Sequence, residues 1–266
     1  MPEPGRLTVV KLGGSLMGAN LSVPLEAVAA APCRTVLVPG GGPFADAVRD
    51  AQDRLGFGDS LAHRLALRAM GAFAAILAER DARFVVAPSR ARIEAAHRTG
   101  RTPVWDPVAL EAGHPDIPEN WDVTSDSLAA WLAHELGAAA LLLLKSVSPA
   151  RTSVRAAALA AEGLVDAAFP AFAARVMGPI RCLGPADWPR LGEALARPEA
   201  AVGTAVRTDR RGCAASGRAT RGARTTRSGR STCKAEGLGR FEAPETPSER
   251  VGGLEARLAW LSASSS

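Results

Sequence analysis

The sequence predicts an α/β protein, a three-layer αβα sandwich built around a mainly parallel central sheet. Three observations lead to this class. Short apolar runs rich in β-branched residues alternate with helical segments through residue 206. Two of these runs end directly in glycine-rich turns. The chain has 266 residues and is 47% apolar, which is enough to bury a sheet on both faces.

The strands are predicted from short apolar runs that are bounded by turn residues. Val9 and Val10 lead into Lys11 and a Gly-Gly pair, and a similar run leads into the glycines at 40–42. The longest apolar run, 136–144, is typical of a strand that is buried on both faces. The expected strands are 9–12, 35–38, 83–86, 103–105, 139–144, 180–183 and 202–206.

The helices are predicted from the spacing of apolar residues and from residues that favour helix starts. Pro43 suits the first turn of one helix, and Asp59, Ser60 and Ser89 can cap two others. The expected helices are 25–30, 44–55, 59–79, 89–97, 128–133, 156–161 and 188–197, with a turn over 165–170. The Pro- and Gly-broken segment 111–120 is expected to be a functional loop.

The composition changes abruptly at Arg207, which divides the chain into an α/β domain at 1–206 and a basic, low-complexity tail at 207–266. The tail holds 12 of the basic residues and 6 of the acidic ones, so the net charge of +5 belongs to the tail and the domain is nearly neutral. A nucleic-acid-binding function of the domain is therefore not expected. The tail is expected to be disordered, and a reading-frame shift would give the same composition.

Other features of the sequence favour a cytoplasmic location. The first residues lack the pattern of a signal peptide, and no run of eighteen apolar residues predicts a membrane span. The four cysteines are scattered and form no CxxC pair, so neither disulfides nor a zinc site are expected.

Several chemically active residues fall at predicted strand ends or helix starts. Because parallel strands end at one edge of a sheet, these residues are expected to meet there. Two lysines, many backbone N–H groups and a carboxylate are what phosphoryl transfer requires. No GxxxxGK[ST] loop or GxGxxG fingerprint is present, which excludes a P-loop enzyme or a Rossmann dehydrogenase by motif. The residues are Lys11, Gly13, Gly14, Gly40, Gly41, Gly42, Asp126 and Lys145.

The order of these motifs resembles the amino acid kinase superfamily, which includes acetylglutamate kinase, aspartokinase, uridylate kinase and isopentenyl phosphate kinase. The resemblance covers residues 7 to about 206 and rests on KLGGS at 11–15, PGGG at 39–42, TSDSLAA at 124–130 and GTAV at 203–206. The segment 121–133 and the helix around 62–70 look most like the kinase of methanofuran biosynthesis. That resemblance implies transfer of the ATP γ-phosphate onto (aminomethyl)furanmethyl phosphate.

The resemblance also implies roles for individual residues, with ATP and Mg²⁺ as cofactors. Lys11 would bridge to the transferred phosphoryl group, Asp126 would orient the lysines directly or through Mg²⁺, and no residue is assigned as a direct metal ligand. One departure is Lys145-Ser146, where many relatives have a hydroxyl or acid followed by Asp; Lys145 is assigned as a second phosphate lysine. The residues expected near the nucleotide are Gly13, Gly14, Ser15, Lys145, Ser146 and Val147. Those expected near the acceptor are Gly40, Gly41, Gly42, His63 and Ser125.

The sequence leaves alternatives open. The acceptor could instead be a carboxylate or UMP, or the protein could bind a nucleotide for storage or regulation without turnover. Asp126 could be a helix cap, as could Thr124 or Ser125, and Lys145 could be solvated. Lys11 differs, because a lysine in a buried strand needs an anionic partner. The family implies at least a homodimer.

Overall fold

The computed structural model describes residues 6–17, 21–149 and 151–209. The tail predicted at 207–266 lies outside the described residues from 210 onward. The strands are β1 (Leu7–Leu12), β2 (Arg34–Pro39), β3 (Phe84–Ala87), β4 (Thr102–Trp105), β5 (Ala140–Leu144), β6 (Ser153–Arg155), β7 (Ile180–Leu183) and β8 (Thr204–Arg207). The α-helices are α1 (Ser22–Ala29), α2 (Gly42–Leu55), α3 (Asp59–Arg80), α4 (Arg90–Arg98), α5 (Ser125–Glu135), α6 (Ala156–Ala161), α7 (Phe169–Ala173) and α8 (Leu191–Ala196). Short 3₁₀ helices cover Gly14–Leu16, Pro107–Ala112 and Pro185–Arg190.

The strands form one eight-stranded sheet in the order β3-β4-β2-β1-β5-β7-β8-β6. All neighbouring pairs are parallel except β7 and β8, which are antiparallel. β1 is central, because it pairs with β2 on one side and with β5 on the other. The predicted fold class is therefore confirmed.

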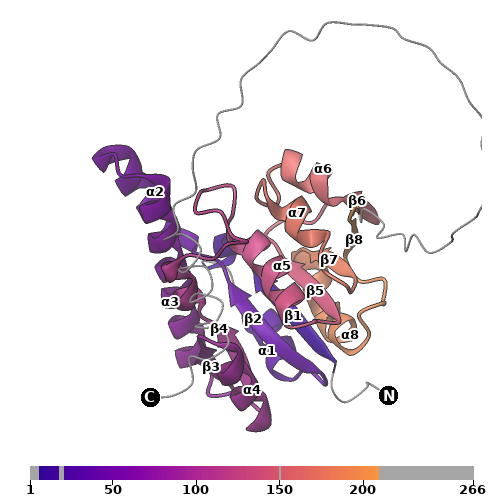
Figure 1. Ribbon diagram of the computed structural model, residues 1–266. Helices are drawn as coiled ribbons and strands as arrows, with labels where there is room; N and C mark the ends of the chain where they lie inside the picture. The colour runs from indigo at the N-terminus through magenta and orange to yellow at the C-terminus, as the bar shows by residue number, and fades with distance from the viewer. Residues whose placement is uncertain (1–5, 18–20, 150, 210–266) are drawn as a thin grey trace, which may run out of the picture.

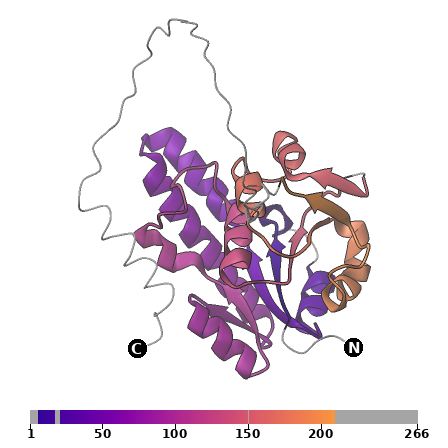
Figure 2. The ribbon, with the colours of Figure 1, turned by 45° about the vertical axis from the view of Figure 1, so that its right-hand side comes forward.

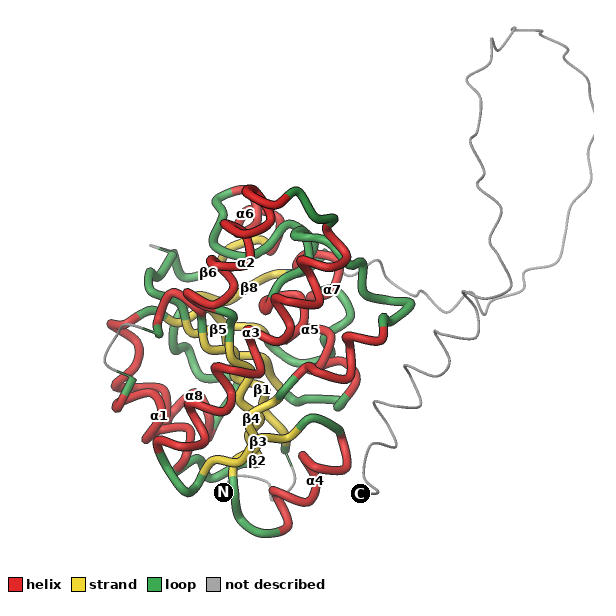
Figure 3. Tube along the Cα trace, turned by 90° about the vertical axis from the view of Figure 1, so that its left-hand side faces the viewer, coloured by secondary structure: helices red, strands yellow, loops and turns green. Residues whose placement is uncertain are grey.

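Helices cover both faces of the sheet (Figure 1), which explains the continuous apolar sequences of the central strands. Alternate residues of β1 and β5 enter different layers: Val9 and Leu141 pack in one apolar cluster, and Val10 and Leu142 in the other. The first cluster contains residues of α5 and α7, and the second contains residues of α1 and α8. Figure 3 shows the strands running between these two pairs of helices, and Figure 2 shows the same layers from another side.

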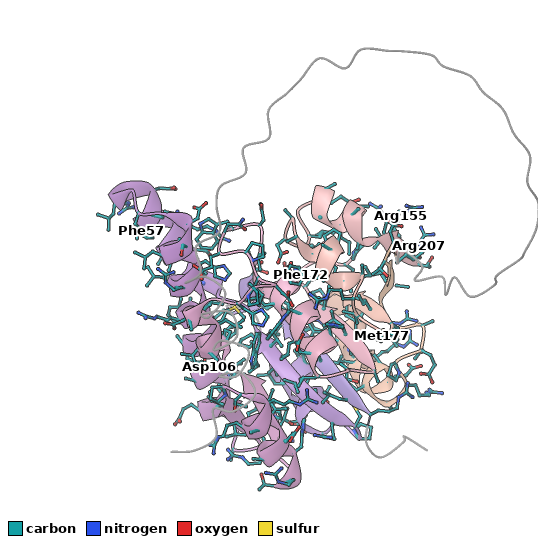
Figure 4. All side chains as sticks on the ribbon, in the orientation of Figure 1. Phe57, Asp106, Arg155, Phe172, Met177 and Arg207 are labelled. Atoms are coloured by element: carbon teal, nitrogen blue, oxygen red, sulfur yellow. The ribbon has the colours of Figure 1, made fainter. Side chains whose placement is uncertain are left out.

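α2 and α3 form an antiparallel hairpin beside the sheet, and their connection, which carries Phe57, points away from it (Figures 1 and 4). By length and mean hydropathy alone α3 could cross a membrane, although no segment was predicted to do so. Its sequence is interrupted by arginines at 64 and 68, and Phe73 and Leu77 are fully buried in the protein core. The apolar character of α3 is therefore explained in part by its packing.

The structure differs from the sequence-based expectations mainly after β5. Strand β6 was not predicted, and the segment expected to turn over 165–170 continues into the helix α7. The helix expected at 188–197 is a 3₁₀ turn followed by the shorter α8, with Pro189 inside the 3₁₀ turn. Proline lacks the N–H that an α-helix needs at that point, which accounts for the interruption.

Candidate active site

Two lysines meet on one buried carboxylate at the carboxyl edge of the sheet. Nζ of Lys11 lies 2.8 Å from Oδ1 of Asp126, and Nζ of Lys145 donates a hydrogen bond of 2.7 Å to Oδ2. The side chains of Lys11 and Asp126 are only 4% and 7% exposed. The structure thus brings together the three residues that were assigned to catalysis, and Lys145 is not the freely solvated lysine of the alternative interpretation.

The positions of these residues follow from the strand register. Lys11 in β1 lies opposite Leu143 of β5, so Lys145, directly after β5, is two residues nearer the carboxyl edge. Asp126 lies in the first turn of α5, which packs against β1. A carboxylate in the first turn is favoured there by the positive end of the helix dipole.

For Lys11 and for Asp126, burial and the opposite charge nearby shift the pKa in opposite directions. Burial lowers the pKa of Lys11 to about 8, although the carboxylate of Asp126 raises it, and Lys145 lowers it further. Burial would raise the pKa of Asp126, but the two lysines beside it outweigh that effect and hold its pKa below the ordinary value. At neutral pH the cluster therefore holds two ammonium groups and one carboxylate, with an excess of positive charge.

Two glycine-rich loops pack backbone to backbone beside this cluster. A Cβ atom on Gly14 would lie 2.5 Å from the nitrogen of Gly42, and one on Gly40 would lie 2.4 Å from the nitrogen of Gly14. Gly13 N–H donates to the carbonyl of Leu144, and Gly40 N–H donates to that of Leu12, so each loop is also fixed to the neighbouring strand. Glycine is needed at 14 and 40 because any side chain would push the loops apart.

The second loop leads into the amino end of α2. Gly41 is the N-cap residue, and no side chain caps the helix. Gly42 has a φ of +52°, a backbone conformation that side-chain-bearing residues rarely adopt, and it precedes Pro43. A 14-residue helix whose first N–H groups have no side-chain acceptor is a favourable place for an anion.

A cavity of about 230 Å³ opens beside this helix end. Gly14, Gly41 and Gly42 form one wall, and His63 and Ser125, both predicted to contact the acceptor, also line it. The other lining residues are Ser15, Ala45, Asp46, Arg49, Ala66, Leu67, Met70, Trp121, Val123, Thr124 and Leu128. The cavity is therefore lined in part by glycine backbone that can bind an anion and in part by apolar side chains.

His63 and Trp121 are held firmly in that wall. His63 is 4% exposed, and burial lowers its pKa despite a hydrogen bond to the backbone of Asn120, so its imidazole is neutral at pH 7. The indole of Trp121 donates a 2.6 Å hydrogen bond to Gln52, and the guanidinium of Arg49 stacks 4.2 Å above its ring centre. The place of Trp121 in the cavity was not predicted from the sequence.

The remaining residues assigned to the nucleotide lie in the first glycine loop and in the turn after β5. Ser15 donates a 3.3 Å hydrogen bond to Ser146, which joins the first glycine loop to the turn after β5. Val147, in the same turn, has an exposed side chain. Ser15 also lines the cavity described above, so the residues assigned to the nucleotide and those assigned to the acceptor adjoin each other.

The start of α5 corrects one expectation. Thr124 occupies the N-cap position, but neither its side chain nor those of Ser125 and Asp126 cap the helix. Asp166 does so from a distant segment, by accepting hydrogen bonds from both N–H groups and both hydroxyls of Thr124 and Ser127. Sequence reasoning did not find Asp166 because it is distant in the chain; only its position at a predicted turn was a weak signal.

The described residues contain no group of three or more His, Cys, Asp or Glu side chains arranged to hold a metal ion. Oδ1 of Asp126 is nevertheless buried without a hydrogen bond of regular geometry. Mg²⁺ commonly binds through substrate phosphates, water and one or two carboxylates. The site would therefore suit a metal that arrives with the phosphates of a nucleotide and needs no cage of protein ligands.

The sequence model of the amino acid kinase family matches residues 6–149, which contain Lys11, Asp126, Lys145 and both glycine loops. This chain belongs to the amino acid kinase family. It is therefore a phosphotransferase that acts on small molecules.

Solved structures agree on the fold. Uridylate kinase from Archaeoglobus fulgidus superposes with a TM-score of 0.58 at 18% identity, over 75% of this chain and 99% of that one. UMP kinase from Ureaplasma parvum gives 0.55 at 14% identity, over 76% and 99%. Aspartate kinase from Synechocystis gives 0.51 at 17% identity, over 66% and 37%. None of the curated proteins matches the chain significantly.

Proposed function

We propose that this protein transfers the γ-phosphoryl group of ATP to a small acceptor that already carries a phosphate. The observation that carries the proposal is the pair of ammonium groups held on Asp126 at 2.7 and 2.8 Å, next to two glycine loops. Positive charge and fixed N–H donors at one point stabilise the charge that develops on a phosphoryl group in flight.

In the proposed reaction an oxygen of the acceptor phosphate forms a bond to the γ-phosphorus, and the bond from that phosphorus to the bridging oxygen breaks, releasing ADP. Lys11 and Lys145 bind the transferred group from the nucleotide side, and the N–H groups of Gly14, Gly41 and Gly42 bind it or the acceptor. Mg²⁺ supplies further charge neutralisation when it is bound with ATP. Asp126 holds the two ammonium groups at the spacing that the phosphates require.

The state of Asp126 supports an acceptor that is already an anion. Both carboxylate oxygens face ammonium groups, and the pKa of Asp126 is held below its ordinary value, so it is a poor base. An alcohol would need a base to take its proton, whereas a phosphate is largely ionised at pH 7 and needs none. A carboxylate acceptor would satisfy the same condition, so the acceptor assay below includes one.

The cavity favours a small acceptor with an apolar body. Besides its anion-binding wall, it presents Leu67, Met70 and Val123, with the neutral His63 among them. These features support (aminomethyl)furanmethyl phosphate as the proposed acceptor: its ring suits the apolar side chains, its phosphate suits the glycine loops, and Asp46 in the same lining is a partner for its ammonium group. UMP would require partners for a ribose and a uracil in a cavity of about 230 Å³.

The test is an ADP-release assay with Mg-ATP in which the acceptor is varied. (Aminomethyl)furanmethyl phosphate, UMP, acetylglutamate and isopentenyl phosphate are compared at equal concentration. We expect ADP release only with an acceptor present, and the fastest release with the furan phosphate. Faster turnover of acetylglutamate or UMP would replace the proposed acceptor, and tight ATP binding without turnover of any acceptor would favour a storage or regulatory protein.

Two further features are proposed for the protein as a whole. We place the catalytic unit within residues 1–206 in the cytoplasm and assign no catalytic role to the tail. We also propose a homo-oligomer, which the resemblance to the family implies.

A further inference from the structure

We propose that Asp166 is a positioning residue for the lysine cluster, an inference that rests on the proposed function. Asp166 lies between α6 and α7, forty residues after the carboxylate that it would position. It lies outside the segment that matches the family, which ends at residue 149. Its carboxylate nevertheless reaches the first turn of α5, where Asp126 is located.

The hydrogen bonds of Asp166 hold the residues on both sides of Asp126. Oδ2 accepts from Thr124 N–H at 3.0 Å, from the Thr124 hydroxyl at 2.8 Å and from Ser127 N–H at 3.0 Å. Oδ1 accepts from the Ser127 hydroxyl. The first N–H groups of a helix have no partner inside the helix, so this carboxylate fixes the position and direction of the turn that carries Asp126.

A second contact holds the two segments together. Ala168 N–H donates a 2.9 Å hydrogen bond to the carbonyl of Asp122, immediately before the start of α5. α5 and α7 also pack against each other in the apolar cluster on that face of the sheet. The segment that carries Asp166 is therefore fixed to α5 by a backbone hydrogen bond and by apolar packing, so Asp166 can hold the turn that carries Asp126 in place.

The charge of Asp166 is stabilised by its donors. Burial and the neighbouring Asp126 raise its pKa, and the hydrogen bonds from Ser127 and Thr124 counteract that rise. Its charge repels that of Asp126, so Asp166 does not hold Asp126 in place by charge attraction. The benefit of Asp166 is consequently geometric: it keeps Asp126 at the distance where both ammonium groups reach it.

This role has a measurable consequence for Lys11. The charged groups acting on Lys11 are Asp126 from α5 and Lys145 after β5, while Cys182 of β7 is a neutral thiol because burial raises its pKa to about 11. Asp126 raises the pKa of Lys11, and burial lowers it. If Asp126 moves away, burial and Lys145 act without opposition and the pKa of Lys11 falls.

The experiment is an NMR titration of ¹³C-lysine in the full chain, which contains three lysines, Lys11, Lys145 and Lys234. Lys→Arg variants assign the signals. We expect Asp166→Ala to lower the pKa of Lys11 by at least half a unit, and Asp166→Asn, which keeps one acceptor oxygen, to lower it less. Glu162→Gln is the matched control, because Glu162 ends the neighbouring α6 and pairs at the surface with Arg151.

Kinetics give the second readout. With the acceptor that the wild type uses, Asp166→Ala should lower kcat about 10- to 100-fold and leave the KM for ATP within about twofold. An unchanged Lys11 pKa in a folded Asp166 variant would overturn the inference. Because the titration needs no turnover, it remains decisive if every acceptor fails, and in that case the proposed function fails separately.

Discussion

Lys11 and Lys145 come from neighbouring parallel strands and approach the two oxygens of a single carboxylate, that of Asp126. β1 and β5 are the central pair of the sheet, so both lysines emerge at its carboxyl edge. The cluster contains two positive charges and one negative charge, so its net positive charge attracts a phosphate that enters from solvent. The relationship explains how a lysine can stand directly after a buried strand.

The pH dependence of activity should report Lys11. Because its pKa is lowered to about 8, the lysine loses its proton at a pH where ordinary lysines keep theirs. We expect kcat/KM, which reports the free enzyme, to be level near pH 7 and to fall as the pH rises through about 8. A profile measured between pH 6 and 10 checks this; activity that stays level to pH 10 would show that the charge of Lys11 is not required.

The contact between the glycine loops should not tolerate a side chain. Gly14→Ala and Gly40→Ala each place a Cβ within 2.5 Å of a backbone nitrogen, so the loops must separate. We expect a loss of about 1–3 kcal/mol in the free energy of unfolding and a large fall in kcat. Denaturant unfolding and steady-state kinetics measure both quantities.

Gly192→Ala is the control for these variants. Gly192 lies in α8, and an added Cβ would meet nothing within 4 Å. Alanine is favoured over glycine in helices by roughly 0.5–1 kcal/mol, so this variant should be as stable as the wild type or more stable. If Gly14→Ala behaved like the control, the close loop contact would have no functional meaning.

The proposed oligomer can be tested on the outer face of α3. Leu61 and Ile76 are exposed there, and charges at both positions should prevent an interface that buries them. We expect light scattering to give a dimer or larger species for the wild type and a monomer for the Leu61→Asp, Ile76→Asp double variant. A wild-type monomer at micromolar concentration would contradict the proposal.

Removal of the tail should leave the catalytic unit unchanged. β8 ends at Arg207, and its pairing with β6 and β7 is complete at that residue. We expect a chain that ends at residue 209 to retain the melting temperature and kcat of the full chain. Insoluble or inactive truncated protein would assign a structural role to residues 210–266.

The sequence predicted the amino-terminal half of the fold well. Its strands are short apolar runs, most of which lead into glycine or proline, and each was expected within a few residues of its position. Parallel topology then required that Lys11, the two glycine loops and Asp126 share an edge, which the structure confirms. The local sequence was sufficient to place these residues because each lies at or next to the end of a strand or the start of a helix that the sequence itself predicts.

The unpredicted parts depend on contacts between distant segments. β6 has three residues and is stabilised by pairing with β8, for which its sequence gives no signal. Asp166 precedes an ordinary turn, and only the folded chain brings it to Thr124 and Ser127. Trp121 resembles a packing residue until Arg49 and Gln52 of α2 are seen beside it.

The most direct test of the account is transfer of label from [γ-³²P]ATP to the acceptor by the wild type and by Lys11→Ala. The exposed Arg98→Ala, on α4, is the control. We predict that the wild type and the control label the acceptor, and that Lys11→Ala loses at least about 10²–10³-fold in rate while it keeps the wild-type circular dichroism spectrum. Labelling at the wild-type rate by Lys11→Ala would contradict the central role given to the lysine cluster.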